Sequence, residues 1–228
     1  QAPQGVTIID QSAETALLAV QGPKTEAVLR PLLGDDIEGI GYYAFREMTL
    51  DGMPLLASRT GYTGEDGFEL FFDRKHADTM WNRLMEAGKP HGIAPIGLAA
   101  RDTLRLEVGY CLYGNDIDDL TTPLEAGLQW TVKLDKPEFI GRQALVTQKA
   151  AGIRKKLVGL TLDQPGMIAR PGMNVESLGE SIGRVTSGTL SPTLKKAVAM
   201  AYVVKGMAAP DTELNVDVRG RPGTARVC

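Results

Sequence analysis

The chain has 228 residues, 43% of them hydrophobic and 23% charged, and a formal net charge of −3. This composition is ordinary for a globular protein and excludes a disordered chain. The small negative charge provides no basic stripe, so we expect no nucleic-acid partner. No apolar run is long enough to cross a bilayer and no signal segment opens the chain, so we expect no membrane partner. The two distant cysteines, Cys111 and Cys228, form neither a disulfide framework nor a metal-binding spacing, which fits a reducing compartment.

The first part of the chain mixes strands and helices. An apolar run stopped by Gly22-Pro23 predicts a strand, and Asp51-Gly52 between two apolar runs predicts a hairpin. The expected elements, in order, are a strand at 16–22, a short helix at 24–33, strands at 42–50, 53–60 and 67–73, and an amphipathic helix at 75–88 that Gly88 ends. This order indicates an α+β protein, and we expect a ferredoxin-like βαββα layer here.

The rest of the chain changes character twice. After a loop rich in proline and glycine, a helix is expected from Leu98 to about Gly109, and Thr121 to Glu125 has the threonine, proline and glutamate of a helix start. Short strands punctuated by glycine and proline follow, which predicts a small antiparallel β-barrel or sandwich. They are expected at 156–162, 174–177, 181–187, 198–204, 213–218 and 223–227. We therefore place a domain break after Gly152, between an α+β region at 1–152 and a barrel domain at 153–228.

The stretch 59–70 holds the most unusual pattern. Glycines at 61, 64 and 67 interrupt two apolar strands, and glycine suits a tight turn because it reaches positive φ. Glu69 follows this turn inside an apolar strand, between Phe68 and Leu70. A carboxylate at this position either faces water or faces a pocket and binds a ligand that carries hydrogen-bond donors.

Standard chemical motifs are absent from the sequence. The acidic run at 115–119 lacks the glycine and the terminal glutamate of a calcium loop, so we expect no metal. Taken alone, the residues indicate a pocket that Glu69, Arg101 and nearby tyrosines could form, without naming a reaction.

Four segments together resemble one family. They are 61–69 (GYTGEDGFE), 97–107 (GLAARDTLRLE), 112–118 (LYGNDID) and 186–194 (TSGTLSPTL). In this order, over nearly the whole chain, they are similar to the aminomethyltransferase (T-protein) of the glycine cleavage system. The resemblance implies a three-domain cloverleaf that binds tetrahydrofolate, takes an aminomethyl group from the lipoyl arm of the H-protein carrier, releases ammonia and forms 5,10-methylenetetrahydrofolate. It also implies a cytoplasmic enzyme, or one of the mitochondrial matrix in a eukaryote.

The resemblance also suggests roles for four residues. Glu69 matches a carboxylate that binds the pterin, where it can accept from a ring N–H and the exocyclic amine together. Arg101 matches a residue that lines the folate site, and its planar fork suits an anionic or carbonyl group. Tyr62 and Tyr110 match aromatic positions near the same pocket and could hold a flat ring by stacking.

The sequence departs from the family at both ends. It opens at Gln1 without a methionine and stops at Cys228, directly after an expected strand, which suggests a piece of a longer protein. The family's catalytic aspartate belongs to an N-terminal portion that precedes Gln1, so no catalytic residue is assigned; Asp35-Asp36 stand in the wrong place for that role. We therefore expect weak folate binding and poor turnover from this chain, because positioning of the reacting groups supplies much of the rate.

Two alternatives share the folate-binding architecture. One is the C-terminal portion of a dimethylglycine or sarcosine dehydrogenase, which would carry a flavin domain upstream. The other is a non-enzymatic folate-binding protein of iron–sulfur maintenance, but neither cysteine follows the Lys-Gly pair that marks that type.

Overall fold

The computed structural model describes residues 5–228, which divide into two compact units between Arg101 and Asp102. The predicted break after Gly152 stays a prediction. Six short 3₁₀ turns accompany the longer elements in this range: Ser12–Glu14, Asp35–Ile37, Arg74–His76, Lys89–His91, Gln129–Thr131 and Lys205–Met207. Among residues 5–228, no helix is both long and apolar enough to cross a bilayer.

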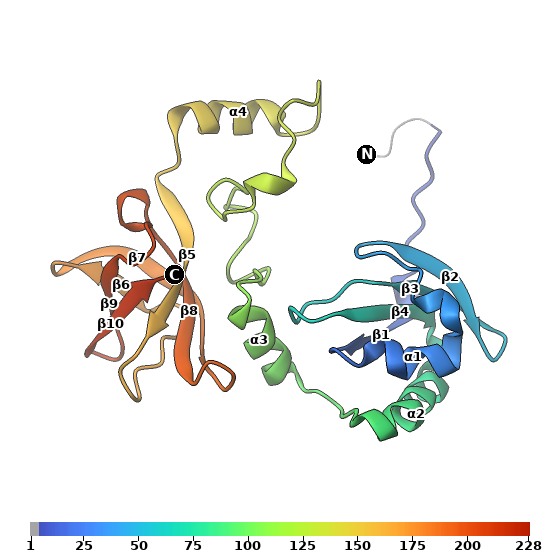
Figure 1. The fold of residues 1–228 in the computed structure, drawn as a ribbon. Helices are drawn as coiled ribbons and strands as arrows, with labels where there is room; N and C mark the ends of the chain where they lie inside the picture. The colour runs from blue at the N-terminus through green and yellow to red at the C-terminus, as the bar shows by residue number, and fades with distance from the viewer. Residues whose placement is uncertain (1–4) are drawn as a thin grey trace. The chain divides into compact units, whose positions relative to one another are not determined.

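The N-terminal unit is a four-stranded antiparallel sheet with two helices (Figure 1). Its elements are β1 (Thr15–Gln21), α1 (Thr25–Leu33), β2 (Phe45–Leu50), β3 (Met53–Ser58), β4 (Gly67–Asp73) and α2 (Ala77–Gly88). The strands pair in the order β1-β4-β3-β2. The α+β class is confirmed, and the layer runs β-α-β-β-β-α, one strand longer than a βαββα unit.

The hairpin of β2 and β3 forms where the sequence predicts it. Leu50 pairs with Met53, and the two turn residues between them have positive φ, 50° at Asp51 and 80° at Gly52. Positive φ at both central residues is the geometry of a type I′ turn, whose twist matches that of the flanking strands.

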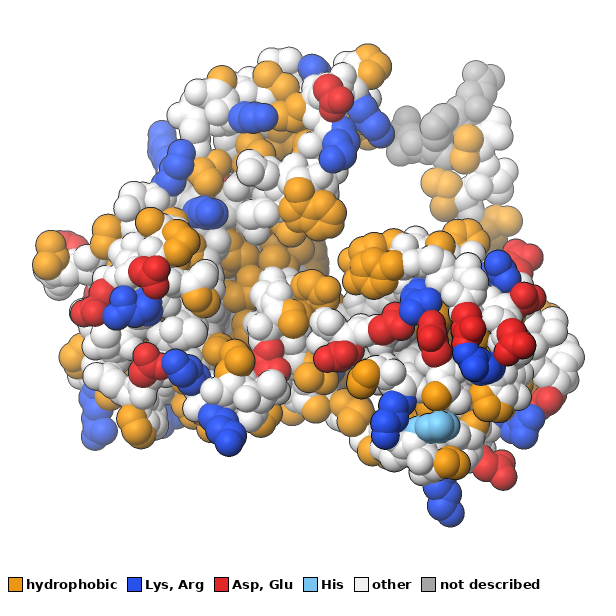
Figure 2. Space-filling model, in the orientation of Figure 1, with side chains coloured by type: hydrophobic (Ala, Val, Ile, Leu, Met, Phe, Trp, Pro, Cys, Tyr) orange, Lys and Arg blue, Asp and Glu red, His pale blue; other side chains and the backbone are white. Residues whose placement is uncertain are grey.

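One face of this sheet makes the core of the N-terminal unit. Phe68, Leu70 and Phe72 of β4 alternate inward and pack with Leu29 of α1 and Met80 of α2. The opposite face is open: Leu17 of β1 is 46% exposed and Phe45 of β2 is 65% exposed. On the face of this unit at the right of Figure 2, several acidic side chains lie side by side, with basic side chains next to them.

The C-terminal unit is built on a closed antiparallel barrel with the strand order β10-β5-β8-β7-β6-β9. The strands are β5 (Lys155–Leu162), β6 (Asn174–Ser177), β7 (Glu180–Ser191), β8 (Lys196–Val204), β9 (Glu213–Asp217) and β10 (Pro222–Val227). Alternate side chains fill the interior, among them Leu160, Val175, Val185, Ala201 and Val216. Of the two predicted all-β architectures, the barrel is therefore the one that forms.

Two helices precede the barrel. α3 (Leu98–Glu107) lies where a helix is predicted, and its Leu106 packs in a small apolar cluster with Leu157, Val198 and Met200. α4 (Arg142–Ala151) is not predicted, and none of its residues is buried.

The helix start predicted at Thr121 is wrong. Thr122 and Glu125 do exchange the two hydrogen bonds of a capping box, at 3.2 and 3.3 Å. The segment nevertheless forms only turns, because Gly127 takes a left-handed φ of 74° before a helix can propagate.

Candidate functional site

Glu69 lies in the middle of β4, on the sheet face opposite the helices. Its neighbours Phe68 and Leu70 are buried in the core, and the alternation of a strand turns Glu69 the other way. Glu69 is half-buried, and its Oε2 atom accepts a hydrogen bond from the Thr60 hydroxyl. Its partner across the β3–β4 pair is Ser58. The carboxylate therefore lies on a partly covered surface with a donor already in place.

The glycine-rich turn before β4 closes around the side chain of Gln21, the last residue of β1. The Gln21 amide donates to the Thr60 carbonyl at 3.1 Å and to the Phe68 carbonyl at 3.4 Å, so it bridges both ends of the turn. A Cβ atom on Gly61 or on Gly67 would overlap this amide. These two glycines are therefore required for space, which is a different reason from the one predicted.

The third glycine of the turn fits the prediction. Gly64 has φ of 81°, which side-chain-bearing residues rarely adopt. Beside it, the Arg59 guanidinium holds Asp66 by two hydrogen bonds, at 2.6 and 3.0 Å, and reaches the Ile40 carbonyl at 3.1 Å. The bond from Arg59 lowers the pKa of Asp66 against the opposing effect of burial, and the bond to Asp66 raises the pKa of Arg59. Arg59 therefore stabilises the turn by an ion pair with Asp66 as well as by its hydrogen bonds.

Two of the four predicted site residues lie together. The guanidinium carbon of Arg101 is 4.4 Å from the centre of the Tyr62 ring, a cation–π geometry, with Arg101 exposed and Tyr62 half-buried. Both belong to the same unit as Glu69, whereas Tyr110 belongs to the C-terminal unit. Tyr110 is half-buried, and its backbone carbonyl accepts from Arg105 at 3.1 Å. The ligand-binding roles of the four residues stay predictions.

The open sheet face also carries a hollow of about 640 Å³. Its lining residues come from β2, β3 and β4: Glu47, Met48, Thr49, Pro54, Leu55, Leu56 and Phe71. Phe71 stands two residues along β4 from Glu69, on the same face. Residues 5–228 contain no group of three His, Cys, Asp or Glu side chains that could hold a metal ion.

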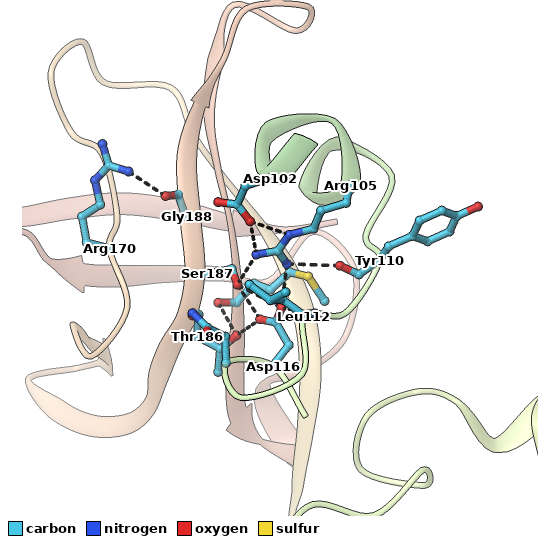
Figure 3. Close-up of polar contacts among 11 residues, drawn as sticks. Asp102, Arg105, Tyr110, Leu112, Asp116, Arg170, Thr186, Ser187 and Gly188 are labelled. Atoms are coloured by element: carbon cyan, nitrogen blue, oxygen red, sulfur yellow. Dashed lines mark hydrogen bonds and ion pairs between the residues drawn. The ribbon is translucent and has the colours of Figure 1, made fainter. Parts of the chain in front are cut away.

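A buried ionic cluster in the C-terminal unit is missed by the sequence reasoning (Figure 3). Arg105 of α3 is 1% exposed and donates to Asp116 at 2.6 Å, to Asp102 at 2.7 Å and to Ser187 of β7 at 2.8 Å. Burial lowers the pKa of Arg105, but the Asp102 and Asp116 carboxylates raise it and prevail. The guanidinium therefore stays charged inside the protein.

Asp116 is the centre of this cluster. It is 0% exposed, and its carboxylate accepts from the Leu112 amide at 2.8 Å, from Ser187 at 2.8 and 2.9 Å, and from the Thr186 hydroxyl. Members of three of the segments that carry the family resemblance thus meet in one hydrogen-bond network. The presence of these residues in segments that carry the resemblance is the sequence signal that could have identified the network. Its position and burial indicate that it joins α3 and the following loop to the barrel.

The fold and these contacts define a chain with an α+β unit and a six-stranded barrel. Residues 1–136 match the family model described as the GCVT N-terminal domain, and residues 155–228 match the glycine cleavage T-protein C-terminal barrel domain. The chain therefore belongs to the glycine cleavage T-protein family.

Curated relatives agree with this assignment. The chain is 47% identical over 224 residues to the aminomethyltransferase of Halothermothrix orenii, covering 98% of this chain and 62% of the relative. It is 51% identical over 225 residues to that of Rubrobacter xylanophilus, covering 97% of this chain and 58% of the relative. The chain thus spans about six-tenths of the length of these relatives. Neither match supports the dehydrogenase or the non-enzymatic alternative.

A solved structure matches as well. The crystal structure of glycine cleavage system aminomethyltransferase T from Bartonella henselae aligns with a TM-score of 0.84 and 34% sequence identity. The alignment covers 93% of this chain and 58% of that one.

Proposed function

We propose that this chain serves aminomethyl transfer in the glycine cleavage system, with tetrahydrofolate as the acceptor. The reaction breaks the C–S bond of a lipoyl-bound aminomethyl group and places its methylene between N5 and N10 of tetrahydrofolate. Ammonia leaves, and the lipoyl group remains as the dithiol. Family membership and relatives named aminomethyltransferase support the proposal. The partners would be tetrahydrofolate and a lipoylated H-protein.

Glu69 is the residue that we assign to pterin recognition. The observation that carries this assignment is a half-buried carboxylate on the open sheet face, held by Thr60 and placed next to a turn that Gln21 and Arg59 fix. A carboxylate can accept from two neighbouring N–H groups of a pterin at once, and such charge-assisted pairs are short and directional. A rigid acceptor reduces the ordering that binding would otherwise require.

Arg101 and Tyr62 are assigned to the same ligand. Their stacked arrangement presents a cation and an aromatic ring from one unit, which suits the carbonyl-bearing, flat portion of a folate. For Tyr110 the proposed role is an aromatic contact. No residue of this chain is assigned to proton transfer, so its roles are binding and orientation.

The test is a titration of the 228-residue chain with tetrahydrofolate. Binding is monitored through the NMR signals of the protein, so that a dissociation constant as weak as about 1 mM is measurable. Glu69→Gln should weaken binding about tenfold or more, because a charged acceptor is replaced by an amide that turns a donor towards the ligand. The matched control is Glu47→Gln, a carboxylate on the same sheet face that lines the hollow. It should bind like the wild type.

Two results would contradict the proposal. One is equal affinity of the wild type and Glu69→Gln. The other is the absence of any saturable response to tetrahydrofolate in the wild type. A loss confined to Glu47→Gln would move the ligand to the hollow and remove Glu69 from the assignment.

A further inference from the structure

Two hydroxyl groups, those of Thr60 and Ser58, are connected to the Glu69 carboxylate by successive hydrogen bonds. Thr60 Oγ1 donates to Glu69 Oε2 and lies 3.1 Å from Ser58 Oγ. Thr60 has a single hydroxyl proton, and a carboxylate only accepts. Since that proton goes to Glu69, the second bond takes its proton from Ser58. The three side chains therefore form a chain of donors that runs from Ser58 through Thr60 to Glu69.

The backbone around this chain is fixed from two sides. Ser58 is the last residue of β3 and pairs directly with Glu69 of β4, which sets the separation of their Cα atoms. Thr60 follows β3, and its carbonyl accepts from the Gln21 amide at 3.1 Å. All three residues are half-buried. The hydroxyl groups are thus held by strand pairing and by the Gln21 contact, and do not depend on mobile surface loops.

The Glu69 carboxylate needs a hydrogen-bond donor to fix its orientation. The terminal torsion of a glutamate is broad, so its two oxygens turn readily unless a donor fixes them. Thr60 holds Oε2 and thereby sets the plane in which the other oxygen is offered. Successive hydrogen bonds also polarise one another, so the Ser58 hydroxyl strengthens the bond from Thr60.

We propose that Thr60, supported by Ser58, is a positioning residue that orients the Glu69 carboxylate for a ligand with two adjacent N–H donors. The inference rests on the proposed function, because the ligand it serves is the pterin of tetrahydrofolate. Neither hydroxyl group is required to touch the ligand. Their effect is transmitted through Glu69.

The experiment compares Thr60→Val, Thr60→Ser and Glu69→Gln in the full chain, with tetrahydrofolate affinity measured by NMR titration. Thr60→Val keeps the shape and removes the donor, so affinity should fall about tenfold. Thr60→Ser keeps the donor and should restore affinity to within about twofold of the wild type. In the Glu69→Gln background, Thr60→Val should cause no further loss, because residues that act through one contact are not additive.

The outcomes separate this inference from the proposed function. If Glu69→Gln weakens binding while Thr60→Val binds like the wild type, the positioning role is overturned and the pterin assignment stands. If Thr60→Val and Thr60→Ser weaken binding equally, the hydroxyl is not the cause and the positioning role is also overturned. If Glu69→Gln has no effect on affinity, the assignment of Glu69 to the pterin is overturned, and the positioning role of Thr60 is overturned with it. Should Thr60→Val not fold, Ser58→Ala replaces it, with a smaller expected loss of about threefold that must disappear in the Glu69→Gln background.

Discussion

Removal of the Asp116 charge should destabilise the barrel unit more than any surface change. In Asp116→Asn the side chain keeps its size, but one carboxylate oxygen becomes an NH₂ group. That group would face the donors that now point at Asp116, which come from Leu112, Ser187 and Arg105. The Arg105 guanidinium, 1% exposed, would at the same time lose its buried counter-charge and keep only Asp102, whose side chain is 50% exposed.

The size of the effect follows from burial. Removing one partner of a buried, hydrogen-bonded ion pair costs about 3–5 kcal/mol, because the remaining charge stays in a medium that solvates it poorly. The matched control is Asp163→Asn in the same unit. Asp163 pairs with Lys196 at 2.9 Å, but its side chain is 66% exposed. Exposed pairs of this kind contribute about 0–1 kcal/mol.

Native-state hydrogen exchange of the β8 amides measures this loss in the unit that contains the cluster. The opening free energy should fall by about 3–5 kcal/mol in Asp116→Asn and by less than about 1 kcal/mol in Asp163→Asn. Amides of β4 in the other unit should keep their protection. The double variant Arg105→Met/Asp116→Leu should recover most of the loss, since apolar replacements remove both charges together. A loss in Asp116→Asn no larger than that of the control would refute the reasoning.

Four further substitutions test the turn and the titrating groups. Gly67→Ala should cost about 1 kcal/mol in urea unfolding, because its Cβ displaces the Gln21 amide, and this cost should vanish in a Gln21→Ala background. Gly64→Ala should cost about 1–2 kcal/mol in both backgrounds, because its φ is positive. A Gly67→Ala cost that persists in the Gln21→Ala background would contradict this division. The pKa of Asp66 is lowered in the folded chain, so the ionised carboxylate stabilises the fold at neutral pH, and this stabilisation is lost as the pH falls through the lowered pKa. Asp66→Asn should remove this part of the acid dependence of the unfolding midpoint. Burial raises the pKa of Tyr202 from 10.0 to about 12, so between these pH values the folded chain keeps a proton that the unfolded chain releases. The free energy of unfolding should therefore fall as the pH rises through this range, and it should fall less in Tyr202→Phe.

Local patterns predicted the elements whose causes are local. The alternation of Phe68, Leu70 and Phe72 identified the buried face of β4, and Asp51-Gly52 identified the turn of the β2–β3 hairpin. The short strands of the last third predicted a barrel or a sandwich, and the closed barrel is what forms. For the strand and for the hairpin, the determining residues are neighbours in the sequence, whereas closure of the barrel pairs β10 with the distant β5.

Contacts between distant residues explain what the sequence did not reveal. Gly61 and Gly67 are small because Gln21, some forty positions earlier, fills the turn. Arg105 looks like a surface charge on a helix, yet its partner Ser187 is 82 positions away. Nothing in either local pattern specifies these pairings, because they depend on how strands and loops come together.

The site shows the same division. The position of Glu69 in an apolar strand made it an anomaly in the sequence, but the Thr60 hydroxyl that holds it is seen only in the folded turn. The helix start predicted at Thr121 failed for the opposite reason. The local capping pattern of Thr122 and Glu125 is present, but the left-handed Gly127 prevents the helix from continuing.

The most direct test of the central claim pairs a protein change with a ligand change. Tetrahydrofolate and its 2-desamino analogue, which lacks the exocyclic amine, are titrated into the wild type and into Glu69→Gln. If Glu69 accepts from that amine, each single change weakens binding about tenfold and the two together weaken it little further. Losses that multiply to about a hundredfold would mean that the amine and Glu69 act independently, and the assignment of Glu69 as the pterin acceptor would be wrong.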